Sequence, residues 1–269
     1  MAERVFHHPY FKKISEGQIP VVVFPGIGQS EKYYQILFEG FDASVFVLDY
    51  KKLIENTTKK HEFSSFFAEL NKLYAVPVYL VCYSFGARPL FKTLLNLSFK
   101  LDYHKEILAV APDAFCPNFW YNILTTPLIN KICRSLVKSK LIKSLTQKIL
   151  VFFGFSPKTL NQVLSVYSLE TILKIWMLWP KRIILLDSSI KWPFRVQCIA
   201  GSQDILFKVS CFEKLSRNSA ESFIFTKLDN EGHFISPLKV KPFLVKLLRK
   251  HEKQKDKNVK PQGGKEVPE

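Results

Sequence analysis

The chain has 269 residues and a mass of 31.2 kDa, a length that doubly wound α/β domains often fill as one unit. Its 47% hydrophobic and 23% charged residues exclude a disordered, collagenous or low-complexity chain. The formal net charge of +16 favours anionic partners such as nucleic acid, acidic carrier proteins or anionic lipid surfaces.

The chain carries no pattern typical of export or membrane insertion. Its first residues lack the apolar stretch of a secretory signal, and no run of about 18 apolar residues is free of charges. The five cysteines are odd in number and form no CxxC pair, which fits reduced thiols in a reducing compartment. We therefore expect a cytoplasmic protein.

Short β-branched and aromatic runs alternate with longer amphipathic stretches along the chain. This alternation is typical of strands separated by helices in a largely parallel sheet. Several of the runs are apolar without alternation, as expected for strands that helices cover on both faces. The predicted strands are 19–24, 44–49, 76–82, 106–111, 194–200 and 222–228.

One long interval breaks this rhythm. Residues 113–192 stay helical in character, so we predict a helical cap inserted into an α/β core made of residues 1–112 and 193–251. The remaining residues, 252–269, hold no apolar side chain except two valines, and we predict a disordered tail there.

Ser84 lies in a segment typical of an activated serine. The sequence Cys82-Tyr83-Ser84-Phe85-Gly86 follows an apolar strand and precedes a helical stretch. A strand, a sharp turn and a helix, with small residues around the serine, form the G-x-S-x-G nucleophile elbow. Here Cys82 stands at the first glycine, where a small side chain keeps the turn plausible. The competing interpretation is a buried structural serine at a strand end.

Asp204 and His233 supply the two further groups that a serine nucleophile needs. Each follows a predicted strand, and reactive groups gather past the carboxyl ends of strands in open α/β sheets. A base takes the serine's proton, and a carboxylate orients the base and stabilises its cation. His233 alone among the six histidines follows a strand in a glycine-containing loop. For Asp204, a turn aspartate that caps the next helix is the competing interpretation.

The segment FPGIGQS, residues 24–30, follows the first predicted strand. Its two glycines allow backbone N–H groups to turn toward a developing oxyanion, and we expect Ile27 and Phe85 to be the donors. The segment lacks the G-x-G-x-x-G spacing of a dinucleotide site, and no His, Cys and Asp spacing supports a metal. We therefore predict no cofactor and no metal.

From about Ile19 to Arg249 the chain resembles the α/β-hydrolase superfamily. The resemblance is carried by the chain order Ser84, Asp204, His233 and by the sequence CYSFGA, which is similar to the GYSFGA of thioesterases in that superfamily. It implies an α/β-hydrolase fold: a mostly parallel, doubly wound sheet with a helical cap inserted between strands 6 and 7.

The resemblance also implies a role for each site residue. Ser84 would be the nucleophile, His233 the general base and then acid, and Asp204 the group that orients it. Two departures from the pattern are Cys82 in place of glycine and Phe24-Pro25 where many relatives have a histidine. They bear on the substrate subclass more than on the mechanism.

The predicted cap carries half of the chain's charge excess, with eleven Lys or Arg against three acidic residues. Lys131, Arg134 and Lys138 fall at i, i+3 and i+7, on one face of a predicted amphipathic helix. A solvated outer face explains this pattern most simply. The alternatives are contact with an anionic membrane surface, which would make the protein peripheral, and binding of an anionic acyl carrier. The basic residues are not interleaved with exposed aromatics, so we expect no nucleic-acid partner.

The sequence thus predicts a serine hydrolase of lipid metabolism that cleaves a carboxylic ester with an apolar acyl group. One alternative is a thioesterase that acts on acyl groups carried by CoA or acyl carrier protein. Another is a non-catalytic protein of the same fold that binds lipid or a partner, because a fold does not fix a function.

Overall fold

The computed structural model describes residues 8–55, 63–74, 76–96, 103–113, 161, 164–178, 194–204, 206–219 and 221–258. Most of the predicted cap lies outside these ranges, including Lys131, Arg134 and Lys138. Within the ranges, no helix combines the length and the apolar character that crossing a membrane requires.

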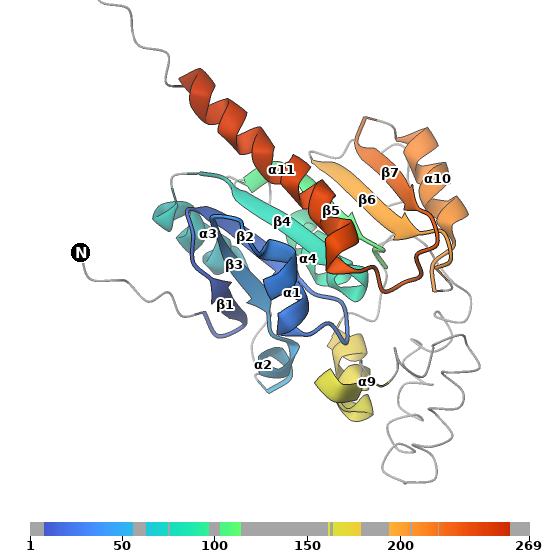
Figure 1. Cartoon of the computed structure of the whole chain (residues 1–269). Coiled ribbons are helices and arrows are strands. Elements are labelled where there is room, and N and C mark those ends of the chain that lie inside the picture. The colour runs from blue at the N-terminus through green and yellow to red at the C-terminus, as the bar shows by residue number, and fades with distance from the viewer. Residues whose placement is uncertain are drawn as a thin grey trace, which may run out of the picture.

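A seven-stranded sheet forms the centre of the molecule (Figure 1). Its strands lie in the order β1-β3-β2-β4-β5-β6-β7; β1 is antiparallel to β3, and all other neighbours are parallel. The strands are β1 (Phe11–Ser15), β2 (Ile19–Phe24), β3 (Ala43–Leu48), β4 (Val78–Tyr83), β5 (Tyr103–Val110), β6 (Arg195–Gly201) and β7 (Phe223–Leu228).

All six predicted strands are present, and β1 is an addition that the sequence did not indicate. The segment FKKIS has two lysines among five residues, which hides its strand character. An edge strand tolerates such side chains because one of its sides needs no partner strand, and charges there discourage pairing with other chains.

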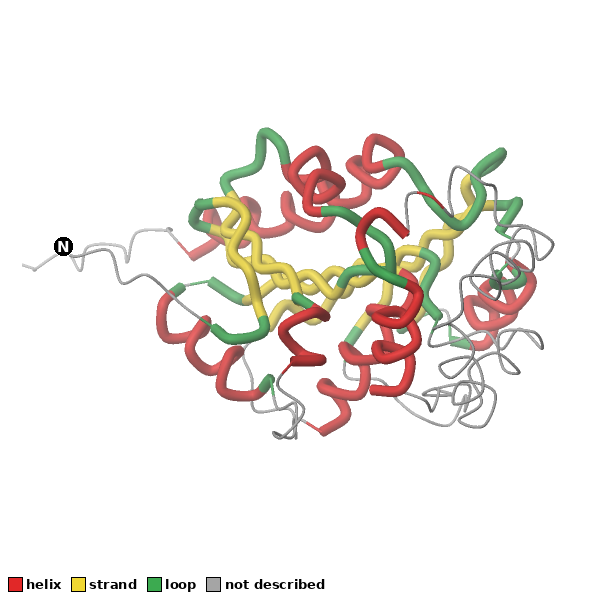
Figure 2. Tube along the Cα trace, turned by 90° about the horizontal axis from the view of Figure 1, so that it is seen from below, coloured by secondary structure: helices red, strands yellow, loops and turns green. Residues whose placement is uncertain are grey.

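Helices cover both faces of the sheet, which appears edge-on as the yellow layer between red helices in Figure 2. On one face lie α1 (Glu31–Phe38) and α11 (Pro237–Asn258), whose apolar side chains share a core with Val81 and Tyr83 of β4. The elements that contribute to the other core are α2 (Tyr50–Glu55), α3 (Ser64–Leu73), α4 (Ala87–Asn96), α9 (Leu169–Leu178) and α10 (Val209–Asn218).

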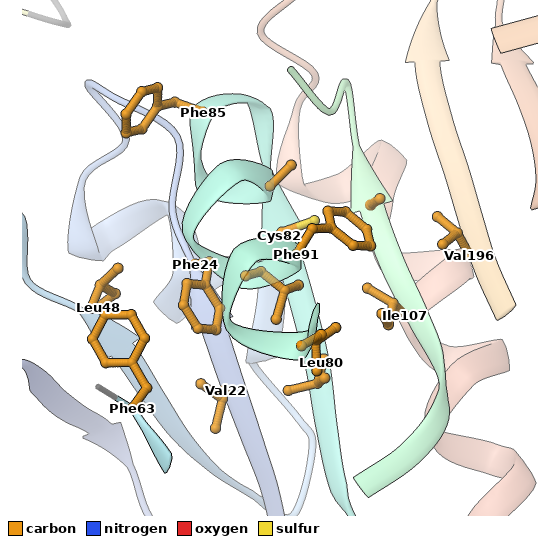
Figure 3. Packing of buried hydrophobic residues seen from close by; sticks show 14 of the residues in the cluster. Val22, Phe24, Leu48, Phe63, Leu80, Cys82, Phe85, Phe91, Ile107 and Val196 are labelled. Carbon is orange, nitrogen blue, oxygen red and sulfur yellow. The ribbon is translucent and has the colours of Figure 1, made fainter. Parts of the chain in front are cut away.

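Successive side chains along each strand point alternately into these two cores, as the period of two in a strand requires. In β4, Leu80 and Cys82 point toward the α4 side and pack with Phe91 and Ile107 (Figure 3). All four side chains are fully buried. The burial of such apolar side chains stabilises the fold by about 1.5–3 kcal/mol for a residue of the size of Leu or Phe.

One boundary differs from the sequence prediction. Helix α11 continues to Asn258, so residues 252–258 are helical and not part of a disordered tail. Their Lys, Glu and Gln side chains are good helix formers, and extending an existing helix costs little compared with starting one. The interval predicted as a cap lies between β5 and β6 as the strands of this structure are numbered, since the described sheet has a single strand before β2.

Candidate active site

Ser84 lies in a strained turn at the carboxyl end of β4. Its φ is 46°, in the left-handed region that non-glycine residues rarely adopt. A short 3-10 helix, η1 (Ser84–Gly86), follows and leads directly into α4. A Cβ at Gly86 would lie 1.9 Å from the carbonyl oxygen of Phe24, so only glycine fits where the turn crosses β2. Strain of this kind costs about 1–3 kcal/mol and is concentrated at functional sites.

His233 contacts both other predicted site residues. Its Nε2 lies 2.9 Å from Ser84 Oγ, and its Nδ1 lies 2.9 Å from Asp204 Oδ2. The imidazole is 6% exposed and the Asp204 side chain is fully buried. The structure therefore brings together three residues that are up to 149 positions apart in the sequence. In this arrangement Nδ1 carries the proton toward Asp204, and Nε2 can accept the proton of Ser84.

Asp204 uses its two carboxylate oxygens for different purposes. Oδ1 accepts hydrogen bonds from the backbone N–H groups of Leu206, at 2.8 Å, and Phe207, at 3.0 Å. Oδ2 contacts His233. Asp204 thus closes a turn and also contacts His233. It does not cap the next helix, because α10 begins at Val209 with Lys208 at its N-cap.

The loops that carry Asp204 and His233 are joined by backbone contacts. The N–H of Gln203 donates to Glu231 O at 2.9 Å, and the N–H of Ser202 donates to Leu228 O at 2.8 Å. Gly201 permits this approach, because a Cβ there would lie 2.1 Å from Glu231 O. These backbone contacts between the two loops therefore fix the separation of the carboxylate and the imidazole.

The glycine loop after β2 lies beside Ser84. A Cβ on Gly26 would lie 3.3 Å from Ser84 Cβ. The N–H of Gly26 donates to Gln29 Oε1 at 3.0 Å, and the Tyr34 hydroxyl donates to the same oxygen. The N–H of Gly26 therefore already has an acceptor, and the amide of Ile27 stays the predicted oxyanion donor from this loop.

The two cysteines nearest the site are packing residues. Cys82 and Cys198 are fully buried, and both lie beside Ala109 of the intervening strand. Burial raises the pKa of both thiols, which keeps them protonated and poorly nucleophilic. Among the described residues, no group of His, Cys, Asp and Glu side chains could hold a metal ion.

Three further residues support the site and were not identified from the sequence. Tyr83 hydrogen-bonds the backbone of the histidine loop, Gln29 ties down the glycine loop, and Asp113 donates its N–H to Ser84 O at 3.0 Å. All three lie within the two motifs or directly after β5. Their proximity to the strand ends was the available signal, but the partners of Tyr83 and Asp113 are distant in sequence.

The arrangement of the sheet and of these loops is that of the α/β-hydrolase fold. No protein-family model matches the sequence, and a search of curated proteins finds no match either. Solved structures nevertheless superpose along most of the chain. MenH from S. aureus has a TM-score of 0.63 at 13% identity and covers 90% of this chain and 99% of its own.

Two further structures of this kind are an esterase and a lipase. A thermophilic esterase from Thermogutta terrifontis has a TM-score of 0.61 at 11% identity, covering 89% of this chain and 92% of its own. A monoacylglycerol lipase from Paleococcus ferrophilus has a TM-score of 0.52 at 13% identity, covering 90% and 98%. At these identities the likeness establishes the fold.

Proposed function

We propose that the protein is a serine hydrolase that cleaves a carboxylic ester with an apolar acyl group. The observation that carries the proposal is the pair of 2.9 Å contacts that link Ser84 Oγ to His233 and His233 to Asp204 Oδ2. A structural serine would need neither a buried imidazole at Oγ nor a carboxylate behind it. The esterase and the lipase among the similar structures support the ester class.

The reaction follows from this geometry. Ser84 Oγ attacks the ester carbonyl carbon while its proton passes to His233 Nε2, and the carbonyl oxygen becomes an oxyanion. The amides of Ile27 and Phe85 would stabilise that charge. The carbon–oxygen bond to the alcohol then breaks, and His233 returns the proton to the departing alcohol. Water repeats the same steps on the acyl-enzyme and releases the acid.

Asp204 and the histidine loop would contribute by preorganisation. Asp204 stabilises the imidazolium that forms in each half of the reaction, and its other oxygen keeps the carboxylate from rotating. No cofactor or metal takes part in this proposed mechanism.

Covalent labelling tests the proposal directly. A fluorophosphonate probe reacts with an activated serine, and we expect it to label the wild-type protein at Ser84 but not Ser84→Ala or His233→Ala. The matched control is Ser210→Ala, which removes an exposed hydroxyl from α10 and should label like the wild type. Undiminished labelling of Ser84→Ala, or no labelling of the wild type, would refute the assignment.

The leaving group is the next question, because the net charge of +16 also favours an anionic acyl carrier. Hydrolysis of p-nitrophenyl butyrate and butyryl-CoA can be compared in the wild type and in a Lys131→Glu/Arg134→Glu/Lys138→Glu variant. If the protein is an ester hydrolase, the triple variant should lose neither activity selectively. A selective loss of the variant's activity on butyryl-CoA would instead support the thioesterase. If the substitutions change the two activities equally, these charges have no role in carrier binding.

A further inference from the structure

The loop that carries His233 is held by the hydroxyl groups of two tyrosines. The Tyr83 hydroxyl donates to His233 O at 2.8 Å and accepts the N–H of Ile235 at 2.6 Å. One side chain therefore bridges two backbone groups, from His233 itself and from the residue two positions after it. The Tyr33 hydroxyl adds a third hydrogen bond, donated to Ile235 O at 2.9 Å.

The position of Tyr83 in the chain gives these contacts their significance. Tyr83 is the last residue of β4 and directly precedes Ser84, so the same strand end holds the serine and the histidine loop. Its side chain points toward the α1 and α11 face, away from the α4 face, and it packs edge-on against Tyr33 with ring centroids 5.8 Å apart. A shift of β4 would carry Ser84 and the loop together.

Burial makes this connection costly to lose. Tyr83 is 2% exposed, so neither His233 O nor the N–H of Ile235 could readily turn to water if the hydroxyl were absent. Burial also raises the pKa of Tyr83 well above its usual value, so the hydroxyl keeps the proton that it donates.

We infer that Tyr83 is a positioning residue, which holds the histidine loop at hydrogen-bonding distance from Ser84, with Tyr33 as its auxiliary. This inference rests on the proposed function, since it assigns Tyr83 a role in presenting the base to the nucleophile. It requires only that Tyr83 act through the backbone of the loop. Tyr83 itself touches no substrate in the mechanism.

The test compares Tyr83→Phe with a matched variant of the same strand. Tyr79→Phe removes a hydroxyl on the same face of β4, four residues earlier, about 13 Å along the strand at roughly 3.3 Å per residue. We expect Tyr83→Phe to slow fluorophosphonate labelling of Ser84 by about 10- to 100-fold, since small displacements of catalytic groups have effects of this size. Tyr79→Phe should stay within about twofold of the wild type when both variants are equally folded by circular dichroism.

Steady-state kinetics on p-nitrophenyl butyrate should show the same difference between Tyr83→Phe and Tyr79→Phe. A positioning role predicts that Tyr83→Phe lowers kcat and leaves KM unchanged. If Tyr83→Phe does not fold, Tyr33→Phe takes its place, with a loss of several-fold in the same direction. Labelling and kcat within about twofold of the wild type in the folded variant would overturn the inference.

A readout that needs no catalysis separates this inference from the proposed function. The proton between His233 Nδ1 and Asp204 Oδ2 should give a far-downfield proton resonance, assigned by its loss in His233→Ala. The signal should persist in Tyr79→Phe and broaden or vanish in Tyr83→Phe. If the wild type is not labelled, the proposed function fails, and this resonance alone decides on Tyr83. An unchanged signal in Tyr83→Phe would overturn its role.

Discussion

Arg88 and Asp113 form a fully buried ion pair, with Arg88 Nε 2.6 Å from Asp113 Oδ2 and Nη2 3.2 Å from Oδ1. Arg88 belongs to the first turn of α4, which begins just after the Ser84 turn, and Asp113 also donates its backbone N–H to Ser84 O. The guanidinium lies 5.2 Å from the centre of the Phe85 ring. The pair therefore fastens the turn of the proposed nucleophile to the end of β5.

Removing one member of this pair should destabilise the protein strongly. Asp113→Asn leaves the charge of Arg88 without its partner in the interior, and Arg88→Met does the same to the charge of Asp113. The loss of one partner costs about 3–5 kcal/mol in comparable buried pairs. Urea denaturation followed by tryptophan fluorescence measures the free energy of unfolding. The double variant Arg88→Met/Asp113→Leu should recover much of the loss, because no buried charge then remains.

A surface ion pair provides the control for this experiment. Lys12 and Glu31 also form an ion pair, but their side chains are 55% and 40% exposed. Lys12→Met should change the free energy of unfolding by less than about 1 kcal/mol. If Arg88→Met were as mild as Lys12→Met, the buried pair would have no special part in holding the turn.

Asp204→Asn and Asp204→Ala should separate the two uses of this side chain. Asparagine keeps an oxygen that can accept from Leu206 and Phe207, but its uncharged amide cannot stabilise the imidazolium. We therefore expect Asp204→Asn to retain the thermal midpoint and lose about 10³- to 10⁴-fold in kcat on p-nitrophenyl butyrate. Asp204→Ala should lose activity and stability together, because the turn also loses its acceptor.

Equal thermal midpoints in the two Asp204 variants would show that the turn contacts contribute nothing measurable. Retention of more than a tenth of kcat in Asp204→Asn would contradict the role of the carboxylate.

The contrast between Asp204 and Arg88 shows what local sequence patterns can and cannot predict. Ser84, Asp204 and His233 were recognisable because each follows an apolar strand, and parallel strands end at one edge of the sheet. Arg88 reads as one more charge in an amphipathic helix, because its partner lies 25 positions away. The contacts of Tyr83 to Ile235 span 152 positions and were equally invisible. The segment FKKIS hid an edge strand for a related reason, since its partner β3 begins 28 residues later.

Cys82 departs from the glycine of the elbow pattern, and the structure explains why it is tolerated. Its φ is not positive, so the backbone needs no glycine there, and its side chain fills a fully buried position on the α4 side. Cys82→Gly should therefore lower the free energy of unfolding by about 1–2 kcal/mol, through lost burial and greater freedom of the unfolded chain.

Labelling of folded Cys82→Gly by the fluorophosphonate should match that of the wild type, and Cys82→Ala should cost less stability. A gain in stability in Cys82→Gly would mean that the thiol strains the turn.

His8 should make the stability of the protein sensitive to acid. Burial lowers the pKa of His8 from 6.5 to about 4, and its Nδ1 accepts the N–H of Tyr10 at 3.2 Å, which the protonated ring could not do. The ring also packs against Phe66, with centroids 4.8 Å apart. Between about pH 6.5 and pH 4 the unfolded chain binds a proton that the folded chain excludes, so the free energy of unfolding falls as the pH falls through this window.

The variant His8→Asn isolates this contribution, because asparagine can offer an acceptor near the position of Nδ1 and does not titrate. Thermal midpoints measured from pH 7 to pH 4 should fall more steeply in the wild type than in His8→Asn, and the two proteins should differ most in pH dependence between about pH 6.5 and pH 4. The other ionisable groups change both proteins alike, so they cancel in the comparison. Parallel curves would mean that His8 titrates in the folded protein as it does in the unfolded chain.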